Sequence, residues 1–221
     1  MAKELAVILN SGSIASAVTT AIAQQKHRLI LLHVDDQPTP GKSTHFFDLQ
    51  QQHFKPHRNH RVNIPFLASL ENSETRSANA DPRTSATGKL VELMPLVALG
   101  LRVAIHHGAK HLYCGLRIGS DSPDFPKVLE HEQIWCELVA HTCDQPELEI
   151  HTPLLDLEPW QVLDLAFQIS APLELTWSCE NQTGEPCGQC RGCQERENAF
   201  VRSGRADPGV KDRRSVRAGS I

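Results

Sequence analysis

The chain has 221 residues, 40% of them hydrophobic, which is enough for one domain with a sizeable core. Its net charge of −4 is unevenly distributed, because the residues after Phe200 include six lysines and arginines but only two aspartates. Residues 1–200 therefore carry a net charge of −8, which excludes a broad nucleic-acid-binding face on them. No apolar stretch approaches the ~20 residues of a membrane span and no signal peptide is recognisable, so we expect a cytoplasmic protein without membrane contacts.

Short apolar runs alternate along the chain with segments of helical periodicity. Leu5–Leu9 and Leu29–Val34 predict strands that are buried on both faces of a parallel sheet, and the alanine-rich segment Ile14–Gln25 between them predicts a helix. The remaining predicted elements are, in chain order, a helix around 46–54, a strand at 61–67, a helix at 90–106, a strand at 111–115, a helix at 125–142, a strand at 148–151 and a helix at 159–169.

This alternation predicts an α/β fold, with a parallel five-stranded sheet and helices on both of its faces. We expect residues 1–170 to form this nucleotide-binding α/β domain. Within it, residues 71–87 contain almost no large apolar side chain, which predicts a mobile surface loop. In sheets of this kind ligands bind beyond the carboxyl ends of the strands, so the turn after the first strand is the first place to search for a site.

That turn reads LNSGSIASAV from Leu9 to Val18. Hydroxyls and backbone N–H groups at the start of a helix can hold a phosphate without any cationic side chain. We therefore predict that Ser11, Gly12, Ser13 and Ser16 bind a nucleotide. The alternative is that Ser11 or Ser13 only caps the helix, a role in which serine is common.

Four cysteines form the most specific motif of the chain. Cys179, Cys187, Cys190 and Cys193 follow the spacing C-x7-C-x2-C-x2-C. Four thiolates in a closed shell suit a structural Zn²⁺ ion, and we expect one per chain within a small zinc-binding subdomain at residues 171–200. A disulfide pair and an iron–sulfur cluster are the alternatives. The other cysteines are expected to be buried thiols, namely Cys114, Cys136 and Cys143.

Residues 201–221 are rich in arginine, glycine and serine and have little apolar surface to bury. We expect this basic segment to be a disordered tail. If the protein contacts nucleic acid at all, the tail is the segment that is expected to do so.

The cysteine motif, placed after such an α/β chain, resembles the 7-cyano-7-deazaguanine synthase family of the PP-loop ATP pyrophosphatases. The likeness extends from about Leu5 to Phe200 and is most specific in TPLLDLEPWQVLDLA and LTWSCENQTGEPCGQCRGCQERENAF. It implies a ligase of queuosine biosynthesis that uses ATP, Mg²⁺ and ammonia to convert a carboxylate on a deazapurine to a nitrile. It also implies a structural zinc ion and a homodimer.

The resemblance is weaker at the first turn, where the family has S-G-G-x-D-S and this chain has SGSIAS. Ser13 replaces the second glycine, which is harmless only if its φ is negative, and Ala15 replaces the aspartate. Later in the chain Gly88 and Lys89 match part of the family's P-G-R-N, so we predict that they also contact the nucleotide, with Lys89 as a phosphate cation. An ordinary solvated lysine is the alternative.

No catalytic residue is assigned from the sequence. Because the first turn has lost its acid, two other functions stay open beside the ligase. One is a pseudoenzyme that binds a nucleotide or a modified base without converting it. The other is a related adenylating enzyme that acts on a different acid.

Overall fold

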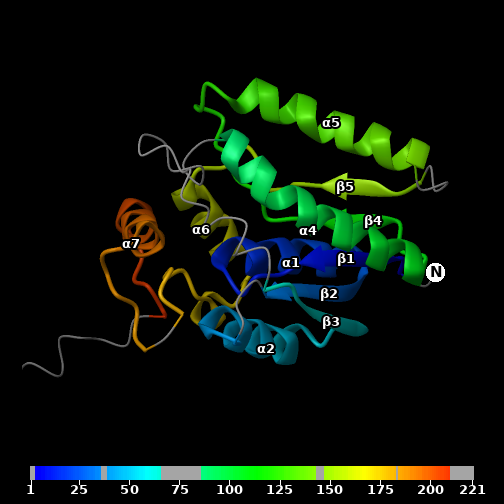
Figure 1. Ribbon diagram of the computed structural model, residues 1–221. Coiled ribbons are helices and arrows are strands. Elements are labelled where there is room, and N and C mark those ends of the chain that lie inside the picture. The colour runs from blue at the N-terminus through cyan, green and yellow to red at the C-terminus, as the bar shows by residue number, and fades with distance from the viewer. Residues whose placement is uncertain (1–2, 36–38, 66–85, 143–146, 183, 210–221) are drawn as a thin grey trace, which may run out of the picture.

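The computed structural model describes residues 3–35, 39–65, 86–142, 147–182 and 184–209 (Figure 1). Its elements are, in chain order, β1 (Leu5–Leu9), α1 (Ile14–Lys26), β2 (Arg28–Asp35), α2 (Lys42–Phe54), β3 (Arg58–Asn63), α4 (Ala86–His107), β4 (His111–Tyr113), α5 (Phe125–Thr142), β5 (Glu149–His151), α6 (Pro159–Gln168), the 3-10 helix η1 (Leu173–Leu175) and α7 (Arg191–Ser203).

The five strands form one parallel sheet in the order β3-β2-β1-β4-β5. This confirms the predicted fold. The strand β1 lies at the centre, and its Val7 is in register with Ile30 of β2 and Leu112 of β4. Because β1 is flanked on both sides, the turn that follows it opens at the middle of the carboxyl edge of the sheet.

Helices cover both faces of this sheet, and the side chains of β1 alternate between them. Val7 and Leu9 belong to the apolar cluster that α4 and α5 complete. Ala6 and Ile8 belong to the cluster on the opposite face, which α1 and α2 complete through Ala23, Phe47 and Phe54. Burial on both faces is the reason that this strand reads as a continuous apolar run.

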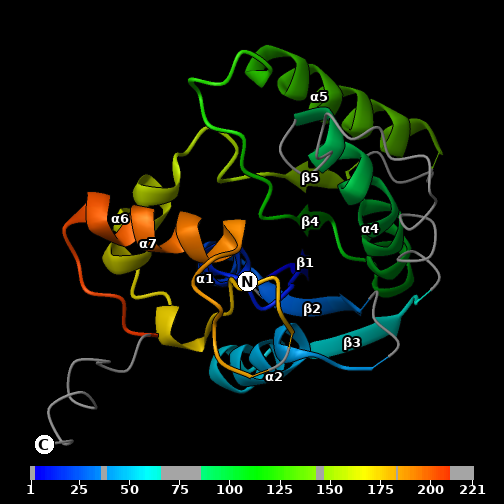
Figure 2. The same ribbon diagram turned by 60° about the vertical axis from the view of Figure 1, so that its left-hand side comes forward.

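The segment after β5 packs on α1 rather than forming a separate core. Phe200 of α7 lies in one apolar cluster with Leu163 of α6 and Val18 of α1. Figure 2 shows α7 beside α6, while the chain between these two helices reaches across to α2. Residues 171–200, predicted as a zinc-binding subdomain, therefore share a core with the α/β domain.

Several predicted boundaries differ from the structure by a few residues, among them those of β3 and of the tail. The strand β3 begins at Arg58 rather than at residue 61, because its polar residues pair with β2 at the edge of the sheet, where most of their side chains remain exposed. The helix α7 continues to Ser203, and Asp207 is held by Arg196, so the predicted tail does not start at residue 201.

The predicted mobile loop 71–87 lies outside the described residues except for the backbone of Ala86 and Thr87, which begins α4. The rest of the predicted tail, residues 210–221, and Cys143 also lie outside them. In the part of the chain that the structure describes, none of the helices has the length and apolar character that crossing a bilayer requires.

Candidate functional site

The turn after β1 is fixed by a buried asparagine. Asn10 is 2% exposed, and its side-chain amide donates to Thr20 Oγ1 at 3.1 Å and to Gln50 Oε1 at 2.9 Å. Its Oδ1 accepts from the N–H of Gly12 at 2.8 Å. Gly12 has φ +78°, and a Cβ there would lie 2.6 Å from the carbonyl oxygen of Ser43, so the turn requires glycine at this position.

Three serine hydroxyls converge at the start of α1. Ser11 Oγ lies 3.1 Å from Ser13 Oγ and 3.0 Å from Ser16 Oγ, and the hydroxyls of Ser13 and Ser16 are 3.2 Å apart. Ser13 has φ −82°, which satisfies the condition for replacing a glycine, and it caps the helix by accepting from the Ser16 N–H. The capping role and a phosphate-binding role are therefore compatible within this one turn.

A cleft of about 250 Å³ opens beside these hydroxyls. Ser11, Ser13, Ser16 and Lys89 all line it, together with apolar side chains from β2 and α4. The structure thus brings together four of the six residues predicted to bind a nucleotide. The other two, Gly12 and Gly88, are buried and are not among the residues that line this cleft.

Lys89 is held in place at this cleft. Its Nζ donates to the carbonyl of Arg117 at 3.2 Å, and the side chain is partly buried. Burial, and then the charge of Arg117, lower the pKa of Lys89 below its ordinary value. A partly desolvated ammonium gains more from a bound phosphate than a fully hydrated one would.

A second cleft, of about 400 Å³, lies on the other side of Ser11 and Ser13. Trp177 lines it and stacks on Phe46 with ring centroids 5.4 Å apart, and an ion pair of 2.5 Å between Arg117 and Glu195 lies on its wall. Sequence reasoning missed Trp177 and Arg117. Their positions in the sequence do not indicate that they line a cleft together with the first turn, because this cleft is formed by segments that are far apart in the chain.

A buried hydrogen-bonded chain connects the end of β2 to the first turn. His33 Nδ1 donates to the Asn10 carbonyl at 2.8 Å, and its Nε2 lies 3.2 Å from Thr44 Oγ1, which donates to Asp35 Oδ2 at 2.7 Å. Burial lowers the pKa of His33. When His33 is neutral, Thr44 can donate its single hydroxyl proton to His33 Nε2 or to Asp35 Oδ2, but not to both. One additional proton on the network would allow both hydrogen bonds to form.

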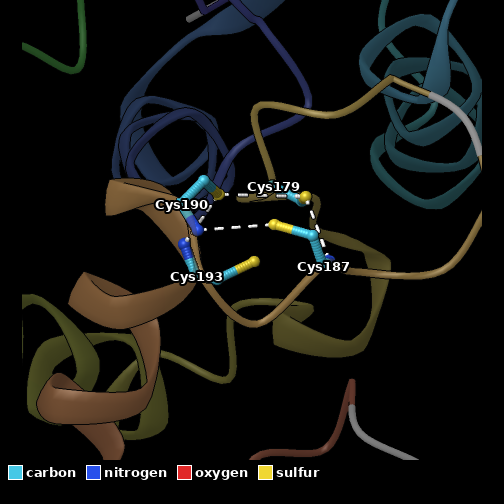
Figure 3. Close-up of side chains that lie close together, drawn as sticks. All are labelled: Cys179, Cys187, Cys190 and Cys193. Atoms are coloured by element: carbon cyan, nitrogen blue, oxygen red, sulfur yellow. Dashed lines mark hydrogen bonds between the residues drawn. The ribbon is translucent and has the colours of Figure 1, made fainter.

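The four predicted cysteine ligands come together (Figure 3), with all four sulfurs within 4.8 Å of one another. The sulfurs of Cys179 and Cys190 are 3.9 Å apart, near the edge of about 3.8 Å that a tetrahedron with Zn–S bonds of ~2.3 Å requires. None of these four thiols is joined in a disulfide in the described part of the chain. The cluster is suited to bind a metal ion.

Backbone N–H groups surround these sulfurs. Those of Asn181 and Cys187 lie 3.4 Å from Cys179 Sγ, and that of Cys193 lies 3.4 Å from Cys190 Sγ, which caps α7. Donation from the N–H groups of Gln189 and Cys190 lowers the pKa of Cys187 to about 6, whereas burial raises that of Cys193 to about 12. A bound cation would stabilise all four thiolates together.

A glycine allows the two arms of the cluster to approach. A Cβ at Gly192, in the first turn of α7, would collide with the carbonyl oxygen of Ser178, the residue before Cys179. The same arm contacts the first turn of the chain, because Trp177 N–H donates to the Gly12 carbonyl at 2.9 Å. Gln182 continues this contact by accepting from the N–H groups of Lys42 and Ser43.

Residues 5–204 match the family model described as queuosine biosynthesis protein QueC. A 7-cyano-7-deazaguanine synthase of Sulfurovum sp. (strain NBC37-1) is 29% identical over 217 residues, covering 92% of this chain and 96% of the relative. The enzyme of that name from Chlorobium luteolum (strain DSM 273 / BCRC 81028 / 2530) is 31% identical over 215 residues, covering 92% and 94%. Among solved structures, the U34-tRNA thiolase NcsA from Methanococcus maripaludis with its [4Fe-4S] cluster is similar at a TM-score of 0.49, with 14% identity over 92% of this chain and 68% of that one.

Proposed function

Because the chain belongs to the family of the queuosine biosynthesis protein QueC, we propose that it is an ATP-dependent ligase that converts a carboxylate on a deazapurine to a nitrile with ammonia. The observation that carries this proposal is the convergence of Ser11, Ser13, Ser16 and Lys89 on one cleft at the carboxyl edge of the sheet. Hydroxyls, helix amides and one cation are the groups that recognise a phosphate chain.

In this proposal the nucleotide occupies the 250 Å³ cleft. Leu32 and Val34 on its wall offer an apolar surface to the base, while the first turn and Lys89 hold the phosphates. Ala15 offers no carboxylate to Mg²⁺, and Glu92 is the acidic residue on the same wall.

The deazapurine acid occupies the second cleft. The indole of Trp177 provides a flat surface for a planar bicyclic ring, and Arg117 provides a cation close to where a carboxylate would lie. Ser11 and Ser13 line both clefts, so an acid in one meets a phosphate chain in the other at these hydroxyls. This placement supports activation of the carboxylate by transfer of an adenylyl group.

We further propose that the four cysteines hold a structural Zn²⁺ ion. Four protein thiolates leave no coordination position for substrate, so the ion would fix the arm that carries Trp177 rather than take part in the reaction. Metal analysis distinguishes this from the iron–sulfur alternative. About one zinc per chain supports the proposal, and iron with sulfide and visible absorbance contradicts it.

A homodimer is also part of the proposal. Apolar side chains on α4 and α5 are unusually exposed, among them Val91 at 61%, Met94 at 54% and Leu138 at 59%. Surfaces of this kind often contact another chain. Sedimentation of the purified protein at twice the monomer mass supports the dimer, and a monomer at micromolar concentration contradicts it.

One observation favours a second candidate function. Ala15 stands where the family has an acid, so the protein is also a candidate nucleotide-binding pseudoenzyme. Incubation with labelled ATP, ammonia and the deazapurine acid separates these functions. We expect AMP to form only when the acid is present, and Lys89→Met to slow its formation more than tenfold while the exposed Lys127→Met does not.

The other outcomes are equally informative. Nucleotide binding in a calorimeter without AMP formation identifies a pseudoenzyme. AMP formation that requires a different acid identifies an adenylating enzyme of another substrate class. If no adenine nucleotide binds at all, the first turn is only a capped helix start and the proposal is wrong.

A further inference from the structure

Three potential metal ligands meet at the opposite end of the sheet from the first turn. His111 begins β4, and Glu149 and His151 are the first and last residues of the neighbouring strand β5 (Figure 1). The parallel register places His111 opposite Glu149 and Tyr113 opposite His151. Since side chains alternate along a strand, all four residues project from the same face.

The ligand atoms are spaced as a metal ion requires. His111 Nδ1 lies 3.0 Å from His151 Nε2, and Glu149 Oε2 lies 3.7 Å and 3.5 Å from these two nitrogens. A tetrahedral Zn²⁺ ion with bonds of ~2.0–2.1 Å separates its ligands by about 3.3–3.4 Å. One of the three distances is shorter than this separation and two are longer, by a few tenths of an ångström at most. Small shifts of the side chains would therefore bring all three ligand atoms to bonding distance from one ion.

A carboxylate on the far side of His111 sets the tautomer that the site needs. Glu4 Oε2 lies 3.2 Å from His111 Nε2 and accepts a hydrogen bond from it, which keeps the ring proton on Nε2 and leaves a lone pair on Nδ1. Metal-binding histidines commonly donate their second N–H to a carboxylate in this way. The His151 ring stacks on Tyr113, with centroids 4.4 Å apart, so its orientation is also restricted.

Charge favours a cation at this place. Lys110 is paired with Glu4 and Glu147, at 3.2 Å and 2.7 Å, while Glu149 faces the two imidazoles. Lys26 is a further cation whose charge reaches His151. Among these groups, three carboxylates against two ammonium groups leave an excess of negative charge around the two imidazoles.

We propose that His111, Glu149 and His151 bind a divalent transition-metal ion, with Zn²⁺ the best match to two imidazoles and one carboxylate. Water completes the coordination, because the Glu149 side chain is 65% exposed. Glu4 is a positioning residue. The ion joins β4 to the edge strand β5 at the amino end of the strands, away from both clefts, and therefore has a structural role that does not depend on the proposed ligase activity.

The test is the stoichiometry of zinc binding by the full chain, measured by titration against a competing chelator. We expect two equivalents per chain, one on the four cysteines and a weaker one on this site. Glu149→Gln and His151→Gln should weaken the second equivalent at least tenfold, whereas the exposed controls Glu130→Gln and His141→Gln should leave it unchanged. Glu4→Gln should weaken it about tenfold.

Spectroscopy of the cobalt-substituted protein gives a second readout. Thiolate-to-cobalt absorption should accompany the first equivalent only, since the second site contains no sulfur. Glu149 is exposed, so Glu149→Gln tests the site even if His151→Gln does not fold. A wild-type protein that binds a single equivalent, or a Glu149→Gln variant that still binds two with unchanged affinity, would show that the His111–His151 contact is only a hydrogen bond.

Discussion

Gly12 and Ser13 are neighbours in the first turn, yet only Gly12 needs to be glycine. Its positive φ and its closeness to the Ser43 carbonyl exclude any side chain, whereas Ser13 has an ordinary extended conformation. The second glycine of the family motif is therefore replaceable without backbone strain, and what Ser13 adds is a hydroxyl that caps α1.

The neighbouring hydroxyls are expected to have separable roles. Ser11 is exposed at the mouth of the clefts, so Ser11→Ala should weaken nucleotide binding by about 1 kcal/mol, roughly fivefold, through loss of one hydrogen bond to a charged group. Ser13→Ala should weaken binding as well, and it should in addition lower the free energy of unfolding by about 1 kcal/mol, because it also removes the cap of α1. Calorimetry and urea unfolding of both variants measure the two effects. An unchanged free energy of unfolding in Ser13→Ala would contradict the capping role of Ser13.

The end of α7 is anchored by one ion pair. Arg196 donates to both carboxylate oxygens of Asp207, at 2.6 Å and 2.7 Å, and to Thr176 Oγ1 at 2.9 Å. The Arg196 and Asp207 side chains are only 12% and 13% exposed. The guanidinium therefore connects α7, the residues after it and the segment that leads to Trp177.

Removing the partner of this guanidinium should be costly. Asp207→Asn, or a chain that ends at Ala206, should lose about 2 kcal/mol of unfolding free energy, because a largely buried charge is left without its carboxylate. A chain that ends at Gly209 keeps the pair and should unfold like the full chain. Thermal unfolding of the three proteins checks this, and equal melting temperatures would show that the pair contributes nothing.

The central strands, the helices and the grouping of the four cysteines were predictable because their signals are local. Continuous apolar runs marked β1 and β2, and a spacing of a few residues was enough to group the cysteines. The edge strand β3 was misplaced because polar residues at a sheet edge do not form an apolar run. Trp177, Arg117 and His33 were missed because each acquires its role from a contact with a distant segment.

Buried histidines connect the stability of the protein to pH. Burial lowers the pKa of His33 below 6.5, so the unfolded chain binds a proton at this residue more readily than the folded chain. The free energy of unfolding should therefore fall as the pH decreases through 6.5 toward the folded-state pKa, by at most about 1.4 kcal/mol per pH unit for this histidine. Burial also lowers the pKa of His27, which adds to the slope.

Urea unfolding between pH 5 and pH 8 measures this slope. His33→Gln should flatten it in the acidic half of the range, and the exposed His53→Gln should not. A variant slope equal to that of the wild type would show that His33 titrates alike in both states.

The hydrogen bond from Trp177 to the Gly12 carbonyl has a consequence for biosynthesis. On the ribosome, β1 and β2 emerge early and can pair, but β4 and then Trp177 emerge much later. Until β4 emerges the central strand has an unpaired edge, and until Trp177 emerges the first turn lacks the contact that closes it. The nascent chain therefore cannot complete the cleft proposed for the nucleotide before the cysteine segment has emerged, and until β4 emerges the free edge of β1 is open to misassociation and to chaperones.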